Sequence, residues 1–275
     1  MIEVNQCGEV LQIKMSAEMG GRPLYWVAAY LVGGLLIDTG CRHTSGEFIK
    51  YIEGQRVDLA VNTHHHEDHV GGNSLLAQKF GVSILAHPAE LPLINSVPEL
   101  NPYQQLVWGY PEPSFASPLP DSLRAGGYCF NAVHTPGHCA GHIALVEPER
   151  GWCFSGDLFV SENQKVLRAD EDIHGILRSA KKLLGLDIPG MKLFTSIGRV
   201  IEDGRGALRQ FVDYLESLQA KVADLHSKGY QPPEIRDAIF GRESVMREPT
   251  GGHYSIENLV RSFLNGDKDK GSFIP

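Results

Sequence analysis

The chain contains 275 residues, of which 42% are hydrophobic, so it can bury the core of one α/β domain together with a smaller appendage. Its formal net charge of −8 argues against a nucleic-acid partner, because such binding depends on Lys and Arg side chains that neutralise phosphates. No apolar stretch is long enough to span a bilayer, and no apolar segment typical of a signal peptide precedes Gly20, so we expect a cytoplasmic protein with no membrane partner.

Apolar runs of strand length recur from residue 10 to residue 155. They lie at residues 10–15, 26–32, 35–38, 59–62, 83–86, 128–134, 143–147 and 152–155. Helical patterns separate several of these runs, and an alternation of strands with helices is typical of an α/β fold.

The most informative segment is Thr63-His64-His65-His66-Glu67-Asp68-His69, because few roles other than metal binding require so many ligand-type side chains together. An expression tag would instead be an uninterrupted histidine run at a terminus. His64 and His66 are two residues apart, so both reach one metal ion from one side of an extended segment. Asp68 and His69 can turn toward a second metal position.

The flanking residues place this cluster in a loop between a strand and a helix. The apolar run at 59–62 predicts a buried strand that ends just before the histidines. A helical pattern begins after Gly71-Gly72, and we expect Asn73 or Ser74 to be its N-cap.

Residues 88–120 are rich in proline and contain Tyr103, Trp108, Tyr110 and Phe115. A long, proline-stiffened, aromatic loop between two strands is uncommon in a compact domain unless it covers something. We therefore expect a lid or pocket wall that receives an apolar or aromatic acyl group of a small-molecule substrate. The alternative is that these side chains pack between copies of the chain in a homo-oligomer.

A second turn with a ligand-type residue follows the strand at 128–134, in Thr135-Pro136-Gly137-His138. His138 stands where Pro and Gly prevent the strand from continuing. The next apolar run ends in Gly156-Asp157, and a carboxylate with two oxygens can bridge two metal ions.

The five cysteines are scattered and odd in number, which indicates reduced thiols rather than a disulfide framework. Cys139 directly follows His138. We expect it to be a small residue in a tight turn, and a redox or ligand role is the alternative.

The remainder of the chain is mostly helical. An amphipathic pattern predicts a helix over residues 172–184 that packs on a sheet, with His174 beside its apolar stripe. Beyond Gly206 only helical patterns occur, and the last of them has Ser255 or Tyr254 as its N-cap. We divide the chain into a domain of residues 1–205 and a C-terminal helical appendage of residues 206–275.

In this order the motifs resemble those of the metallo-β-lactamase superfamily: a His-x-His-x-Asp-His cluster, a Thr-Pro-Gly-His turn and a Gly-Asp pair. The resemblance covers roughly residues 10–205 and implies a four-layer αβ/βα sandwich of the α/β class with a C-terminal helical extension. It also implies two metal positions that share Asp157. The first would be held by His64, His66 and His138, and the second would be lined by Asp68 and His69. Asp38, in Ile37-Asp38-Thr39-Gly40, resembles the family's acidic residue behind the ligands.

One position departs from the family's pattern. The last family ligand is a His in a Pro-Gly-His-Gly turn, and Ile197 occupies the corresponding position in Thr195-Ser196-Ile197-Gly198. An aliphatic side chain cannot coordinate a metal ion. We therefore expect one tightly bound ion, zinc with iron or manganese as alternatives, and a second site that is weak or absent. The sequence leaves open whether His174 or His253 replaces the missing ligand.

The resemblance implies a metal-dependent hydrolase. In such enzymes a metal-bound hydroxide attacks an ester, thioester or lactone carbonyl, because the metal ion lowers the pKa of its bound water. Asp68 is the predicted catalytic residue, since it would accept a hydrogen bond from the hydroxide and carry a proton toward the leaving group.

Two alternative functions belong to other classes. A mononuclear iron enzyme similar to the persulfide dioxygenases could use His64, His138 and Asp157 as its two-histidine, one-carboxylate triad. However, the Gly-Cys-Gly-Arg-Thr-Asp stretch of that branch is missing after Asp157, where Leu158-Phe159-Val160-Ser161 follows. The other alternative is a ligand-binding protein that has lost catalysis together with the second metal site.

Overall fold

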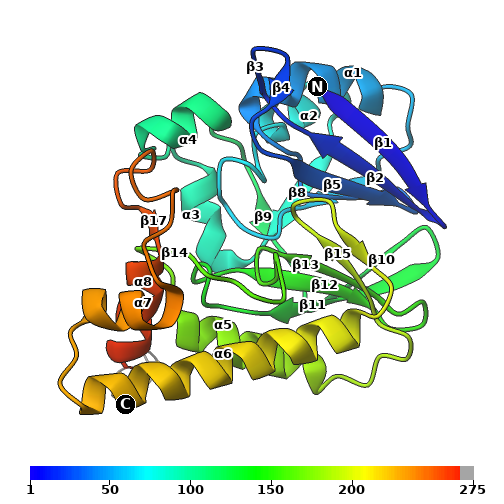
Figure 1. Cartoon of the computed structure of the whole chain (residues 1–275). Coiled ribbons are helices and arrows are strands. Elements are labelled where there is room, and N and C mark those ends of the chain that lie inside the picture. Colours follow the sequence, from blue (N-terminus) through cyan, green and yellow to red (C-terminus); the bar gives the residue numbers. More distant parts are fainter. Residues whose placement is uncertain (267–275) are drawn as a thin grey trace, which may run out of the picture.

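The computed structural model describes residues 1–266 and contains two mixed β-sheets packed face to face, with helices on both outer sides (Figure 1). The sheet that includes β1, β2 and β5 lies above the sheet that includes β10 to β13, and α5 and α6 cover the lower face of the second sheet. This arrangement confirms the predicted α/β four-layer sandwich with C-terminal helices. Residues 267–275, the end of the predicted appendage, lie outside the described residues.

The first sheet has the strand order β1-β2-β5-β6-β7-β8-β9. Its strands are β1 (Ile2–Cys7), β2 (Val10–Met15), β5 (Val27–Val32), β6 (Leu35–Ile37), β7 (Leu59–Val61), β8 (Ser83–Ala86) and β9 (Ser117–Pro118). Neighbouring strands from β1 to β6 are antiparallel, whereas those from β6 to β9 are parallel. Because parallel strands end at one edge of a sheet, the loops after β6, β7 and β8 lie side by side there.

The second sheet has the order β10-β11-β12-β13-β15-β16. Its strands are β10 (Ser122–Ala125), β11 (Tyr128–His134), β12 (Ile143–Glu147), β13 (Trp152–Gly156), β15 (Lys192–Thr195) and β16 (Val200–Ile201). All neighbours are antiparallel except β13 and β15. Two short pairs lie outside the sheets: β3 (Glu18–Met19) with β4 (Arg22–Pro23), and β14 (Leu167–Arg168) with β17 (Tyr254–Ser255).

The helices cover the two outer faces and one edge of the sandwich. The 3-10 helices are η1 (Arg42–Thr44) and η2 (Pro88–Glu90). The α-helices are α1 (Ser45–Ile52), α2 (Asn73–Phe80), α3 (Leu91–Ile94), α4 (Pro102–Val107), α5 (Ile173–Leu184), α6 (Gly204–Ser227), α7 (Pro232–Phe240) and α8 (Ile256–Leu264). None of the helices within residues 1–266 is both long enough and apolar enough to cross a membrane.

The two sheets are held together by a layer of aromatic and aliphatic side chains. Tyr30 of β5 faces Phe154 of β13, with ring centroids 5.4 Å apart, and Phe154 stacks on Phe194 of β15 at 4.8 Å. The Tyr30 hydroxyl donates a hydrogen bond to the backbone oxygen of Thr195 at 2.5 Å. This packing fixes the position of one sheet's loops relative to the other's.

The C-terminal helices share a hydrophobic core with the second sheet. Phe211 and Leu215 of α6 belong to the same buried cluster as Val146 and Cys153 of the sheet. The predicted domain boundary at residue 205 falls in the first turn of α6. The structure therefore shows no separate core for the part of the appendage within residues 206–266.

The strand pattern is predicted well from the sequence, but two local predictions are wrong. The runs at 10–15, 83–86, 128–134 and 143–147 match β2, β8, β11 and β12. Ser255 is the N-cap of α8, and its hydroxyl accepts a hydrogen bond from the Asn258 amide at 2.9 Å. The N-cap of α2 is Gly72, because the Asn73 side chain bonds Asn62 instead. Residues 88–120 form η2, α3, α4 and β9 rather than a long loop.

We predict that Phe211→Ala lowers the free energy of unfolding by about 3–5 kcal/mol, because the ring is fully buried between α6 and the sheet. Denaturant unfolding should show one transition for the whole chain. Phe115→Ala is the matched control, since Phe115 is 78% exposed, and its effect should stay within about 0.5 kcal/mol. A separate early transition for the helices, with the main one unchanged, would show that they fold as an independent unit.

Candidate metal centre

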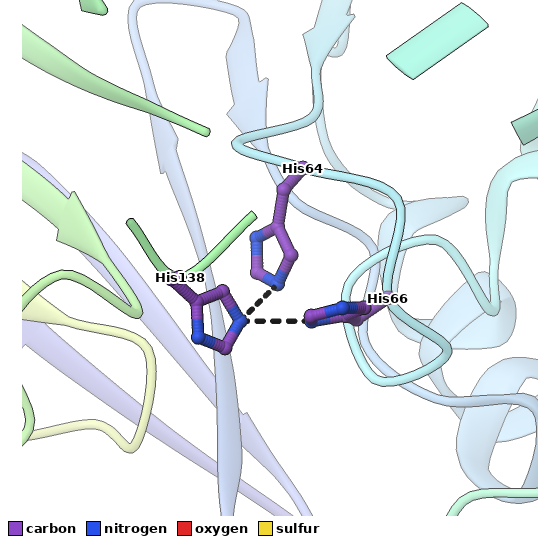
Figure 2. Close-up of side chains that lie close together, drawn as sticks. All are labelled: His64, His66 and His138. Carbon is purple, nitrogen blue, oxygen red and sulfur yellow. Dashed lines mark hydrogen bonds between the residues drawn. The ribbon is translucent and has the colours of Figure 1, made fainter. Parts of the chain in front are cut away.

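Three buried histidine nitrogens converge at the edge of the sandwich. His64 and His66 lie on the loop after β7, and His138 lies on the loop after β11 (Figure 2). The Nε2 atom of His138 is 3.1 Å from Nε2 of His64 and 2.8 Å from Nδ1 of His66. The ring planes are nearly perpendicular, so each ring presents one nitrogen edge to the same point.

This group fits a metal ion. In tetrahedral zinc sites, metal–nitrogen bonds of about 2.0–2.1 Å place two ligand nitrogens roughly 3.3 Å apart, close to the spacing seen here. Burial, with the neighbouring histidines, lowers the pKa of His64 well below its usual range. Burial and the charge of Arg168 do the same to the pKa of His66. Both rings are therefore neutral, which is the form of imidazole that coordinates metals.

A second group of ligand-type atoms adjoins the first and is formed by His64, His69 and Asp157. Oδ1 of Asp157 lies 3.2 Å from Nε2 of His69, and its Oδ2 lies 3.3 Å from Nε2 of His138. The carboxylate therefore has one oxygen toward each group. Within the described residues, Nε2 of His69 is buried and makes no hydrogen bond of acceptable geometry. A buried nitrogen that lies beside a carboxylate without a hydrogen bond is consistent with a metal ligand.

The two acidic residues of the centre differ in their proton affinity. Burial raises the pKa of Asp68 to about 7, and Asp157 adds to this effect although His69 opposes it. Burial would also raise the pKa of Asp157, but His69 and His138 hold it well below its usual range. Oδ2 of Asp68 lies 3.8 Å from Nε2 of His69, farther than the Asp157 oxygen. Asp157 is thus suited to hold a cation, and Asp68 to exchange a proton.

Buried carboxylates orient two of the histidines from behind. Nδ1 of His138 is 2.5 Å from Oε1 of Glu171, and Nδ1 of His69 is 2.8 Å from Oδ2 of Asp38. Asp38 also accepts hydrogen bonds from the amide and the hydroxyl of Thr63, both at 2.8 Å. Such contacts fix the ring orientation and raise the basicity of the nitrogen that faces the metal.

Sequence reasoning located Asp38 but missed Glu171 and Arg168. Glu171 accepts a hydrogen bond from the Arg168 amide at 2.8 Å, so Glu171 lies in the turn that follows Arg168, the last residue of β14. The Arg168 guanidinium pairs with Asp170, and its Nη1 lies 3.4 Å from Nδ1 of His66. No motif or spacing connects these residues with the histidines, because the contact arises only from the fold.

The two histidines considered as substitute ligands lie elsewhere. Nε2 of His174 is 3.2 Å from the backbone oxygen of Phe263. Nδ1 of His253 is 2.7 Å from the Tyr103 hydroxyl. Within residues 1–266, neither histidine belongs to the groups that could hold a metal ion. Ile197, which the sequence predicts at the position of the family's last ligand, lines the same cavity as Asp157, and its side chain carries no donor atom.

A cavity of about 390 Å³ opens above the centre. Asp68, His138 and Asp157 line its polar end. The other walls are mostly apolar and include Leu24, Tyr25, Val27, Tyr103, Val107, Trp108, Val160, Val166, Ile197, Met246 and Tyr254. Trp108 therefore lines the cavity as predicted, whereas Tyr110 and Phe115 are exposed side chains outside it.

Comparisons with known proteins agree with this geometry. A family model described as Metallo-beta-lactamase superfamily matches residues 27–189, more than half of the chain. The chain is 27% identical over 212 residues to Beta-lactamase-like protein 2 homolog of Drosophila melanogaster, covering 70% of this chain and 65% of that protein. It is 29% identical over 164 residues to Hydroxyacylglutathione hydrolase of Legionella pneumophila (strain Paris), covering 58% and 57%.

The fold also matches solved structures. A beta-lactamase domain protein from Burkholderia ambifaria superposes with a TM-score of 0.67 at 17% identity, covering 96% of this chain and 84% of that one. The chain spans less than two thirds of the length of the fly and Legionella relatives. The similarity to these relatives therefore does not by itself transfer their activities.

We predict that His64→Ala and His138→Ala each remove the tightly bound metal ion, because each deletes one of the converging nitrogens. The loss of affinity should exceed the roughly 10–100-fold typical of outer contacts. Metal per chain, measured by elemental mass spectrometry on freshly purified protein, is the readout. His174→Ala should keep the metal content of the wild type. Unchanged metal content in His138→Ala would contradict the assignment.

Proposed function

Because the chain belongs to the metallo-β-lactamase superfamily, we propose that it is a metal-dependent hydrolase that cleaves ester or thioester bonds of small acyl compounds. The observation that carries this proposal is the group of buried histidine nitrogens and the Asp157 carboxylate at the polar end of a largely apolar cavity. The Legionella relative is named for hydrolysis of a hydroxyacyl derivative of glutathione. A thioester is therefore the first substrate class to test.

The chain's own residues support this chemistry. His64, His66 and His138, with Asp157, would hold a divalent metal ion, which supplies Lewis-acid activation of water and of the carbonyl group. Asp68 borders the cavity and has a pKa near neutrality, so it can accept a proton from the attacking water and deliver it to the leaving group. Glu171 and Asp38 keep the rings in place during these steps.

Arg168 is the cationic side chain among the residues that line the cavity. Its Nε and Nη2 atoms are engaged by Asp170, whereas Nη1 lies toward the histidines. A guanidinium at this place is suited to donate a hydrogen bond to an oxygen of the substrate. The apolar walls, including Trp108 and Tyr25, would then receive the acyl chain and exclude water.

The proposed ion is zinc, with one site that binds tightly. In support, His64, His66 and His138 provide the three nitrogen ligands common in catalytic zinc sites. At the second position the structure places His69 and the shared Asp157 beside His64, with Asp68 3.8 Å from His69, and Ile197 offers no donor atom. Three ligands, one of them shared between two ions, hold a metal ion weakly.

The proposal is tested by turnover. Zinc-loaded protein should hydrolyse members of a panel of small esters and thioesters, and chelation should abolish the activity. Asp68→Asn should keep the tightly bound zinc but lose most of kcat, because an amide cannot accept a proton. The absence of turnover on the whole panel by metal-loaded protein would refute the proposed function. Loss of all zinc in Asp68→Asn would make Asp68 a ligand of the first position.

We further predict that Ile197→His strengthens the second metal site. The change restores a nitrogen donor in a turn where Gly198 already has a φ of 78°. The affinity for a second zinc ion should rise by at least roughly 10–100-fold, measured by calorimetric titration of protein loaded with one ion. Ile197→Val is the control and should bind like the wild type. If the wild type already holds two tightly bound ions, the weak second site is wrong.

A further inference from the structure

Glu90 is a fully buried carboxylate that does not belong to the centre formed by His64, His66, His138, His69 and Asp157. It ends η2, which follows β8 in the first sheet. Burying a carboxylate is costly unless hydrogen-bond donors surround it. Its contacts therefore indicate which parts of the structure it stabilises.

The two oxygens of Glu90 bind two different loops. Oε2 accepts a hydrogen bond from the amide of His65 at 2.9 Å and lies 2.5 Å from Nδ1 of the same residue. Oε1 accepts a hydrogen bond from the amide of Gly141 at 2.8 Å. The thiol of Cys139 is 3.7 Å from both oxygens.

Both loops carry residues of the metal centre. His65 stands between His64 and His66, and Cys139 directly follows His138. Glu90 is thus the carboxylate that connects the loop of the first sheet to the loop of the second sheet beside the centre. The distance between His138 and the other two histidines depends on how these loops are held together.

We propose that Glu90 is a positioning residue, which holds the loop at 64–66 against the loop at 138–141 and thereby sets the spacing of the metal-binding nitrogens. The inference rests on the proposed function only in assuming that these nitrogens bind a metal ion. Outer contacts of this kind typically change metal affinity by roughly 10–100-fold.

A metal site formed by His65, Glu90 and Cys139 is the competing interpretation, because these three residues lie close together. The contacts favour the positioning role. Each oxygen of Glu90 already accepts a hydrogen bond from a backbone amide.

Gly141 offers an independent way to disturb the same contact. A Cβ atom at this position would lie 2.4 Å from Oε1 of Glu90, so alanine must displace the carboxylate. Gly141 is not among the residues with positive φ, and alanine therefore introduces no backbone strain there. Two substitutions far apart in the sequence should thus have the same effect.

The experiment measures zinc affinity by competition with a chromophoric chelator, without any substrate. Glu90→Gln replaces one acceptor by an NH2 group that faces a backbone donor, and Gly141→Ala pushes the carboxylate away. Each should weaken zinc binding by roughly 10–100-fold, and the double variant should be no weaker than the worse single variant, because both remove one contact. The Co²⁺ absorption spectrum should change in both.

Matched controls are available in the chain. Glu99→Gln replaces an exposed carboxylate near the same segment, and Gly46→Ala adds a methyl group where no atom lies within 4 Å. Both should bind zinc like the wild type. Cys139→Ala should also keep its affinity, because the thiol contact is long; a loss of one zinc ion per chain in this variant would favour the competing metal site.

Circular dichroism and the Tm of the metal-free variants separate positioning from general stability. Wild-type zinc affinity in folded Glu90→Gln and Gly141→Ala would overturn the proposal, and so would a lowered Tm without a loss of affinity. Should Glu90→Gln fail to fold, Gly141→Ala decides by the same criterion. A protein that binds zinc as described but hydrolyses nothing would refute the proposed function and leave the role of Glu90 intact.

Discussion

The architecture depends on bringing nitrogens of three buried histidines to one point from loops of two different sheets. Nitrogen atoms that lie 2.8 and 3.1 Å apart in a buried site are well placed to share a cation. The spacing is set by the contact between the sheets, where Tyr30 packs on Phe154 and bonds Thr195. The packing of the two sheets therefore also sets the geometry of the metal centre.

Buried carboxylates complete this arrangement. Asp38, Glu171 and Glu90 each lie behind or between the ligand loops, and each has its oxygens bound by backbone or side-chain donors. Their negative charge favours a divalent cation at the centre, and their hydrogen bonds restrict the rings to one orientation. Asp68 differs because burial raises its pKa to about 7. This pKa suits the transfer of protons rather than the positioning of the histidine rings.

The C-terminal segment contributes to the cavity as well as to the core. Strand β17 pairs with β14, which places Tyr254 opposite Arg168, and both side chains line the cavity. Met246 reaches the same cavity from the preceding loop. Earlier parts of the chain therefore supply most of the cavity lining, and the C-terminal segment adds Met246 and Tyr254 to it.

The sequence by itself determined the local features of this protein. The histidine cluster, the turn at His138 and the Gly156-Asp157 pair are encoded in short stretches, and hydrophobic periodicity was enough to predict β2, β8, β11 and β12. Only the tertiary structure decided which distant residues support these motifs. Glu90 meets Gly141, and Glu171 meets His138, through the packing of sheets, and no spacing in the sequence records such a contact. Periodicity likewise shows that helices follow strands after residue 205, but not that the apolar face of α6 shares a buried cluster with the second sheet.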